Sequence, residues 1–499
     1  MLPVAHAMRF RWNLILLLVG PFAALGFVLL RWGFLRASSL AGPDDAYISY
    51  RYAWNLAHGN GFVFNPGDAP IQGTSTPLYT GMLAIFGLVG VDIPTAGYYI
   101  GAFGVAVSMC LLFQIGRQLK QPGAGLAAAL VWGTSPFTRD YMLGMETPIY
   151  IVLILGSFLA LTADRRCAAL TLAGLAVLTR LDAFAFLASM LVYLIWTRRL
   201  DWRQVLPSFV LISAWLVFAT FYFGSPVPES AAAKSAVGAG LFGPFSPFSN
   251  MLMHLIVPAT ALSVSADAAL FTVGILALPF ALYALQRRIP KTRLLILWLV
   301  FYVGGFVVLN LPNVPWYYGP PAVVGSLLVW LQIDHLLKPL PFRLRAGSLA
   351  LIGGAALIIL VLPVASVKSG CGPLAVPECE ERPPWFQAGL WLKANAPHDS
   401  TVAAYDVGMI GYASNLRVID LVGLTEPRAL AFLEQHDYAW AIRETKPDYV
   451  FTDELSDWPI TNAIFAMPQF RENYTLVARF PHRRNMDFLL YRRNNARMH

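Results

Sequence analysis

The chain has 499 residues, of which 57% are hydrophobic and only 13% are charged, and its net charge is +8. Soluble domains carry about 25% charged residues, so this composition excludes an ordinary soluble globular protein. The apolar residues come in blocks of about 17 to 22, the length of a helix that crosses a bilayer. The sequence therefore predicts a polytopic α-helical membrane protein.

Eleven apolar blocks are predicted to span the membrane. They lie near residues 13–32, 97–116, 123–137, 147–163, 167–178, 183–197, 205–223, 268–285, 294–311, 319–337 and 346–367. The first block has no small-residue cleavage signature, so we interpret it as a retained helix rather than a signal peptide. The apolar stretch from Thr76 to Val91 is too short to span, and we predict a helix that lies in the outer interface or re-enters from it.

The basic residues predict the orientation of these spans. If the N-terminus is cytoplasmic, the inner connections hold 16 Lys and Arg residues and the outer connections hold 6, as the positive-inside rule requires. The outer connections also hold nine acids against three inside. Because polar residues are costly near a bilayer, we expect the chemistry on the outer face. The odd number of spans places the C-terminal tail on that face too.

The densest polar segment follows the first span. Asp44 and Asp45 stand at the start of a predicted helix, and two adjacent acids are more than an N-cap requires, although a cap is the structural alternative. One side of this helix carries Tyr47, Tyr50, Arg51 and Trp54. A polar turn then reaches Gln72-Gly73-Thr74-Ser75-Thr76, and Tyr79 lies in the first turn of the interfacial helix.

Three shorter motifs lie at the outer ends of other spans. Glu146 opens a span, and the structural alternative is a helix cap. Arg180 and Asp182 stand between two spans, where a mutual ion pair is the alternative. The third motif is the aromatic run Trp316, Tyr317 and Tyr318, for which the alternative is an interfacial belt. Four polar motifs on one face together favour a common site.

Residues 368–499 differ in composition, with 14 Lys or Arg and 16 Asp or Glu. We predict a small external α/β domain here, with a helix over Trp385–Ala394. Its predicted strands are Thr401–Tyr405, Val418–Val422, Tyr449–Thr452 and Phe488–Arg492. Cys371 and Cys379 are predicted to form a disulfide in an oxidising compartment, with two free thiols as the alternative. There is no nucleotide-binding glycine motif and no zinc-type Cys/His spacing.

The segment from Asp44 to Tyr79 resembles the C-type (GT-C) membrane glycosyltransferases, which use a polyprenyl-phosphate sugar as donor. The similarity is greatest to bacterial relatives of the mycobacterial terminal arabinofuranosyltransferase. It rests on Asp44-Asp45-Ala46-Tyr47-Ile48, Arg51-Tyr52-Ala53, Asn65-Pro66-Gly67 and Pro77-Leu78-Tyr79. The motifs around Glu146, Arg180 and Trp316, and the tail segments Tyr405–Tyr412 and Val418–Leu424, are also similar to that family.

The resemblance implies a transmembrane glycosyltransferase module over residues 1–367, with its catalytic external loop at 33–96, and an external domain over 368–499. The implied reaction is the inverting transfer of one monosaccharide, such as arabinofuranose, to an extracytoplasmic glycan, glycolipid or protein. The implied location is the bacterial inner membrane, with the active site and C-terminal domain outside. Nucleic acid is not an expected partner. The alternatives are a non-catalytic glycolipid flippase or assembly protein, and a lipid-linked glycan ligase or polymerase.

In such an enzyme a carboxylate takes the proton of the attacking acceptor hydroxyl. By its place in the motif Asp44 is the expected base, and Asp45 would orient the acceptor or a neighbouring basic group. Arg180, with Arg139 or Lys234, would stabilise the leaving phosphate. The residues expected to bind donor or acceptor are Tyr47, Arg51, Thr74, Ser75, Tyr79, Glu146, Arg180, Asp182, Trp316, Tyr317 and Tyr318. No cofactor is expected to be essential, although the two acids could hold one divalent cation.

Overall fold

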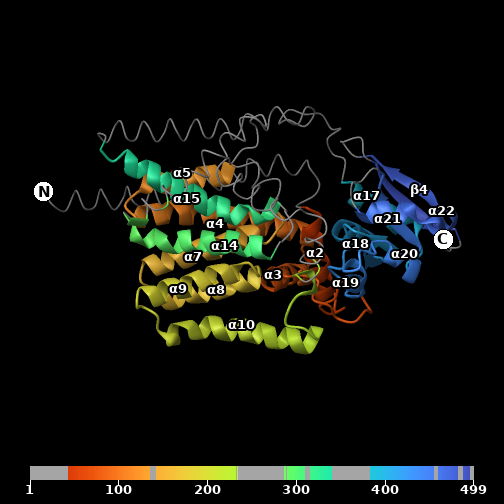
Figure 1. Ribbon diagram of the computed structural model, residues 1–499, viewed down its shortest axis with the longest axis horizontal. Coiled ribbons are helices and arrows are strands. Elements are labelled where there is room, and N and C mark those ends of the chain that lie inside the picture. Colours follow the sequence, from red (N-terminus) through yellow and green to blue (C-terminus); the bar gives the residue numbers. More distant parts are fainter. Residues whose placement is uncertain are drawn as a thin grey trace.

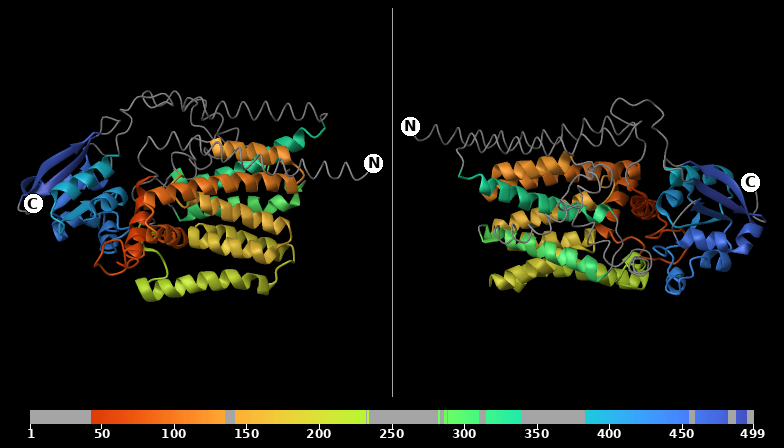
Figure 2. Two further views of the ribbon diagram at one scale, coloured as in Figure 1. Left: turned by 180° about the vertical axis from the view of Figure 1, so that it is seen from behind. Right: turned by 45° about the horizontal axis from the view of Figure 1, so that its top comes forward.

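The computed structural model describes residues 43–134, 142–231, 233, 282, 286–287, 289–309, 315–339, 383–454, 459–481 and 487–494. A bundle of roughly parallel apolar helices lies at one end of the molecule, and an α/β part lies at the other (Figure 1). Figure 2 shows the same division from two further directions, with α2 and α3 between the two parts.

In the part of the chain that the structure describes, eight apolar helices form the bundle, and each coincides with a predicted span. They are α4 (Ile93–Gln118), α5 (Pro122–Thr134), α7 (Thr147–Thr162), α8 (Arg166–Thr179), α9 (Ala183–Trp196), α10 (Trp202–Phe223), α14 (Arg293–Val308) and α15 (Gly319–Leu336). Among the described helices, α4 and α10 are the two found long and apolar enough to cross a membrane on their own. The predicted spans 13–32, 268–285 and 346–367 lie outside the described residues, apart from Leu282, so the count of eleven stays a prediction.

Small residues allow the bundle helices to approach closely. Where α4 crosses α5, a Cβ added to Gly125 would lie 2.6 Å from the carbonyl oxygen of Leu112. Close crossings of this kind are typical of helices packed in membranes. Buried side chains from α4, α5, α7, α8, α9, α14 and α15 form one continuous apolar core. By contrast, α10 leaves large apolar side chains exposed, such as Phe221 at 87%, which suits contact with lipid.

Two helices connect the bundle to the α/β part. α2 (Asp44–Ala57) and α3 (Pro77–Leu88) pack on each other and on the start of α4. α3 is the helix predicted near 76–91, and it leaves Ile85 and Leu88 63% and 67% exposed. Apolar side chains on a short exposed helix suit a membrane interface, but the position of α3 relative to a bilayer stays a prediction.

The α/β part contains one five-stranded sheet in the order β2-β1-β3-β5-β4. The strands are β1 (Thr401–Ala404), β2 (Arg417–Asp420), β3 (Tyr449–Asp453), β4 (Tyr474–Phe480) and β5 (Phe488–Arg493). β1 pairs in parallel with β2 and β3, whereas β5 is antiparallel to β3 and β4. Its helices are α17 (Pro384–Asn395), α18 (Gly408–Ser414), α19 (Arg428–Leu433), α20 (Trp440–Glu444), α21 (Pro459–Ala466) and α22 (Pro468–Asn473).

The four predicted strands and the predicted helix of this part are confirmed within a few residues. β4 was not predicted, because a bulge between Leu476 and Ala478 breaks the alternation of buried and exposed side chains. Cys371 and Cys379 lie outside the described residues, as does the predicted boundary at 367/368. The disulfide and the domain boundary therefore stay predictions.

Buried polar contacts join the α/β part to α2 and the loop that follows it. Arg51, only 2% exposed, donates to the carbonyl oxygens of Leu416 at 2.6 Å and Phe64 at 2.7 Å. The side-chain amide of Asn65 accepts from the backbone N–H of Val418 and donates to its carbonyl oxygen, both at 3.0 Å. Since Asn65 pairs with β2 much as a neighbouring strand would, loop and sheet are held in one register.

Candidate active site

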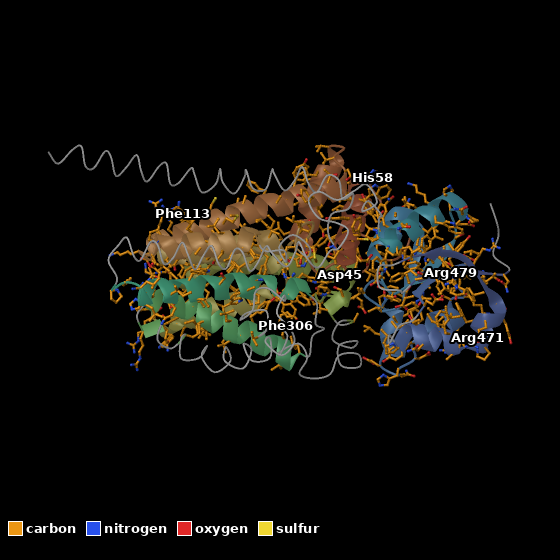
Figure 3. The ribbon with its side chains drawn as sticks, turned by 90° about the horizontal axis from the view of Figure 1, so that it is seen from above. Asp45, His58, Phe113, Phe306, Arg471 and Arg479 are labelled. Carbon is orange, nitrogen blue, oxygen red and sulfur yellow. The ribbon has the colours of Figure 1, made fainter. Side chains whose placement is uncertain are left out.

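A cavity of about 140 Å³ lies where α2, the turn before α3 and the ends of the bundle helices meet the α/β part. Asp45 and Phe306 both line it, and Figure 3 shows Asp45 at the junction between the two parts. Its polar and aromatic lining residues are Asp45, Ser49, Thr74, Ser75, Thr76, Glu146, Arg180, Asp182, Ser230, Phe306, Trp316 and Tyr317. Leu424 is the lining residue from the α/β part.

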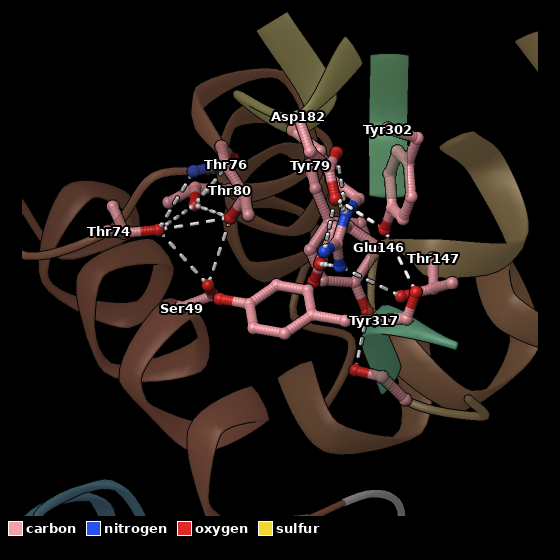
Figure 4. Close-up of polar contacts among 12 residues, drawn as sticks. Ser49, Thr74, Thr76, Tyr79, Thr80, Glu146, Thr147, Asp182, Tyr302 and Tyr317 are labelled. Carbon is pink, nitrogen blue, oxygen red and sulfur yellow. Dashed lines mark hydrogen bonds and ion pairs between the residues drawn. The ribbon is translucent and has the colours of Figure 1, made fainter. Parts of the chain in front are cut away.

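An ion cluster forms one wall of the cavity (Figure 4). Arg180 donates from Nη1 to Glu146 at 2.6 Å and from Nη2 to Asp182 at 2.8 Å. These three side chains are only 5%, 6% and 11% exposed. The guanidinium also lies over the ring of Tyr317, 5.0 Å from its centroid. A buried Arg held this way fixes the two carboxylates, and the cluster keeps one excess negative charge.

Neighbouring hydroxyls and aromatic rings hold this wall in place. The hydroxyl of Tyr302 lies 3.0 Å from an oxygen of Asp182 and 2.9 Å from the carbonyl oxygen of Tyr317. These two acceptors share its single O–H donor. Behind Glu146, the hydroxyls of Tyr50 and Tyr79 both donate to the carbonyl oxygen of Gly144, at 2.6 and 2.7 Å. The turn that presents Glu146 is therefore clamped from two helices.

A cluster of buried hydroxyl groups forms the opposite wall. Ser49, Thr74 and Thr76 lie within 3.0 to 3.1 Å of one another, oxygen to oxygen. Behind them Thr80 donates to the carbonyl oxygen of Thr76 and lies 3.4 Å from the hydroxyls of Thr74 and Thr76. Since hydroxyls both donate and accept and can rotate, this wall suits a ligand that presents hydroxyl groups.

The two acids at the start of α2 have different surroundings. Asp45 lines the cavity. Asp44 is absent from that lining and faces the α/β part, where its carboxylate accepts from the backbone N–H groups of Gly408 at 2.9 Å and Met409 at 2.7 Å. α2 itself begins after Pro43 with no side-chain cap. Asp44 thus caps α18 rather than its own helix.

Asp44 is surrounded by further acids from the α/β part. Burial raises the pKa of Asp44 to about 7, against the two backbone N–H groups that lower it. Burial, then the nearby Asp44, raises the pKa of Asp406 well above its usual range, and Trp385 donates to Asp406 at 2.7 Å. Burial also raises the pKa of Asp420 to about 6. This junction therefore concentrates carboxyl groups that ionise reluctantly.

The structure brings together most of the predicted site residues, but not all. Asp45, Thr74, Ser75, Glu146, Arg180, Asp182, Trp316 and Tyr317 line the cavity, whereas Asp44, Tyr47, Arg51, Tyr79 and Tyr318 do not. Tyr47 packs against the rings of Tyr50, Phe386 and Tyr412, and Arg51 joins α2 to the sheet. Arg139 and Lys234, the other predicted phosphate ligands, lie outside the described residues.

Sequence reasoning missed several residues of the cavity. Ser49 is one helical turn beyond Asp45, and Thr76 continues the polar run Thr74-Ser75, so their spacing carried a usable signal. Leu424 ends a tail segment that was noted only for its resemblance to the family. Phe306 carried no signal, because it belongs to an ordinary apolar helix that only the fold brings to the cavity.

Residues 378–495 match a family described as a domain of unknown function (DUF8728). A curated relative, the terminal β-(1→2)-arabinofuranosyltransferase of Mycobacterium tuberculosis, is 30% identical over 243 residues. That match covers 42% of this chain and 37% of the relative, so the chain spans well under half the length of the relative that it matches.

Two solved structures are similar across most of the chain. The oligosaccharyltransferase AglB of Archaeoglobus fulgidus, in complex with an inhibitory peptide and a dolichol-phosphate, has a TM-score of 0.55 at 15% identity, over 89% of this chain and 70% of its own. ArnT of Cupriavidus metallidurans, bound to undecaprenyl phosphate, has a TM-score of 0.51 at 13% identity, over 95% and 97%.

These similarities define the class to which the fold belongs. The helical bundle with its α/β part has the fold of the GT-C membrane glycosyltransferases AglB and ArnT, which supports an α-helical membrane fold for this chain. Within this class, the sequence similarity is to an arabinofuranosyltransferase. The resemblance found in the sequence motifs is thereby confirmed.

Proposed function

We propose that the chain is an inverting membrane glycosyltransferase that moves one monosaccharide from a polyprenyl-phosphate donor to an extracytoplasmic glycan, glycolipid or protein. The observation that carries this proposal is the cavity, in which Asp45 lies with the Glu146–Arg180–Asp182 cluster. AglB and ArnT were solved with lipid phosphates, and the curated relative is named for a pentofuranose. Arabinofuranose is therefore the first sugar to test.

The size of the cavity supports a single sugar ring. Its volume is about 140 Å³, below the roughly 300–1,000 Å³ of sites for drug-sized ligands. A sugar lying between the hydroxyl wall and the ion cluster would find donors and acceptors on both sides. An oligosaccharide donor, as a ligase or polymerase would use, would have to extend beyond this space.

We assign the catalytic base to Asp45 rather than to Asp44, which the motif had favoured. A base must reach the acceptor hydroxyl, and Asp45 lines the cavity while both oxygens of Asp44 accept backbone N–H groups of α18. In the proposed step Asp45 takes the acceptor proton, the acceptor oxygen bonds to the anomeric carbon, and the bond to phosphate breaks with its electron pair on the lipid phosphate. Asp44 then acts as a positioning residue.

We also revise the expected role of Arg180. Its guanidinium already binds two carboxylates at 2.6 and 2.8 Å, which leaves it poorly placed to receive a leaving phosphate as well. We propose that Arg180 holds Glu146 and Asp182 as hydrogen-bond acceptors for sugar hydroxyls. The charge of the departing phosphate would then be met by groups nearer the lipid.

The finer topology belongs to this proposal as well. We infer eleven membrane helices in the bacterial inner membrane, a cytoplasmic N-terminus, and the cavity and C-terminal domain (368–499) on the outer face. The distribution of Lys and Arg supports this orientation. A reporter fused after His499 that works only outside the cytoplasm should be active, and activity of a cytoplasm-only reporter would contradict the topology.

Purified protein with radiolabelled prenyl-phosphate sugars tests the function. Transfer of the sugar, with release of prenyl phosphate in equal amount, is the expected result. Reaction with a prenyl-pyrophosphate glycan alone would indicate a ligase or polymerase. Lipid movement across vesicles without any transfer would indicate a flippase. Transfer that survives EDTA would support the prediction that no divalent cation is essential.

A further inference from the structure

A second cavity lies at the end of the bundle away from the α/β part. It is a groove of about 700 Å³ between α4, α7 and α8. α7 begins beside Glu146 of the first cavity and ends at the groove, so the two sites are separated by the length of this helix, 16 residues or about 24 Å. Figure 3 labels Phe113 of α4 near this end of the bundle, far from Asp45.

The groove has an apolar floor and a basic rim. Leu111, Leu159 and Leu172 line its length, while Arg117 and Arg165 stand at its end with Gln114 and Gln118. An apolar trough that ends in cations matches a molecule with a hydrocarbon tail and an anionic head.

The charges of the two rim arginines are not neutralised by the part of the chain that the structure describes. No described carboxylate lies within ion-pair distance of Arg117 or Arg165; the hydrogen bond found for Arg117 is to the Gln114 side chain, at 3.4 Å. By contrast, the adjacent Arg166 is paired with Asp164 at 2.9 Å. Two unpaired guanidinium groups beside an apolar surface are suited to bind one phosphate.

A glycine creates the hollow. Gly156 of α7 lies in the floor, and a Cβ added there would meet only Leu172 at 3.6 Å and Leu111 at 4.0 Å. These are ordinary contact distances, so a larger side chain at this position would project into the groove without displacing backbone. The helix is open here because this residue has no side chain.

We propose that this groove binds an anionic phospholipid, with its phosphate on Arg117 and Arg165 and an acyl chain over Gly156. Basic pockets between membrane helices are known binding places for such headgroups. The volume of about 700 Å³ lies within the roughly 300–1,000 Å³ range of ligand sites. The inference is independent of the proposed glycosyl transfer, because it uses neither the first cavity nor its residues.

Native mass spectrometry of the full-length purified protein tests the proposal. The protein is titrated with phosphatidylglycerol and, separately, with phosphatidylcholine of identical acyl chains. We expect one phosphatidylglycerol to bind preferentially. The double variant Arg117→Gln/Arg165→Gln should lose about thirtyfold in that affinity, because each basic residue near the membrane surface contributes roughly fivefold. Gly156→Leu should displace both lipids from this position.

Arg203→Gln is the matched control, since Arg203 belongs to the same predicted face but lies outside the groove. It should bind phosphatidylglycerol like the unmodified protein. Equal retention of the two lipids by the unmodified protein would overturn the proposal. So would unchanged retention in the double variant, or an equal loss in Arg203→Gln. Because Gly156→Leu leaves every charge in place, it separates loss of the groove from loss of charge.

Discussion

The adjacent acids Asp44 and Asp45 offer the sharpest test, because the structure gives them different surroundings. Asp45→Asn keeps the size of the side chain in the cavity but removes the proton acceptor. Loss of a general base typically lowers the rate by about a hundredfold or more. We therefore expect transfer by Asp45→Asn to fall by at least that factor, with thermal unfolding unchanged.

Asp44→Asn should behave in the opposite way. The carboxylate of Asp44 accepts two backbone N–H groups through its two oxygens, whereas an amide has only one oxygen to offer. One buried N–H of α18 would then face an amide NH₂ group, at a cost of about 1–3 kcal/mol in the free energy of unfolding. The rate of sugar transfer should fall only to the extent that the α/β part is destabilised.

The assay measures thermal unfolding and initial transfer rate for the same purified variants. Asp68→Asn is the control, because Asp68 also links the loop to the α/β part but is 30% exposed, in a pair with Arg417 at 3.1 Å. That pair should contribute less than about 1 kcal/mol. If Asp45→Asn transfers sugar normally while Asp44→Asn folds normally and is inactive, the motif-based assignment to Asp44 was right and the geometric one is wrong.

Three further predictions follow from the same junction. Gly408→Ala should lower the melting temperature, because the added Cβ would lie 2.0 Å from the carbonyl oxygen of Asp44. Such overpacking costs about 1–3 kcal/mol in the free energy of unfolding. An unchanged melting curve would contradict this prediction. Thr76→Val removes a hydroxyl from the cavity wall and should raise the KM for the donor by about three- to tenfold. Thr80 is buried behind that wall, so Thr80→Val should leave the KM unchanged. Equal effects of the two substitutions would indicate a structural role for both residues. Because the pKa of Asp44 rises from its ordinary 3.8 to about 7, its contribution to stability is present below about pH 4 and lost as pH rises toward 7. Melting temperatures across this range should show that loss, and Asp44→Asn should reduce it.

Much of the fold could be predicted because its signals are local. Apolar blocks of membrane length and the hydrophobic pattern of strands such as Tyr449–Asp453 depend only on neighbouring residues. The site segments could also be predicted, since acids and aromatic runs at the ends of apolar helices are unusual enough to stand out. Thr74, Glu146, Arg180 and Trp316 were found in this way and line one cavity.

The contacts that assign roles could not be predicted, because they join residues far apart in the chain. Which acid of the pair faces the cavity depends on Gly408, 364 residues after Asp44. Arg180 looked like a cation available to phosphate, but Glu146, 34 residues earlier, already binds it. Spacing along a helix shows that the side chains of two adjacent acids point in different directions. It cannot show which of the two side chains faces the cavity and which faces the α/β part.

The arrangement of the cavity also bears on how two substrates could meet there. Inversion places the attacking acceptor and the departing phosphate on opposite faces of the sugar. Asp45 lies on α2, next to the α/β part, whereas Arg180 and Trp316 lie at the ends of bundle helices. In the proposed reaction the lipid-linked donor arrives from the bundle, because its hydrocarbon chain stays in the bilayer. We therefore propose that the acceptor approaches from the side of the α/β part, where the proposed base stands and where Asp44 ties α2 to α18.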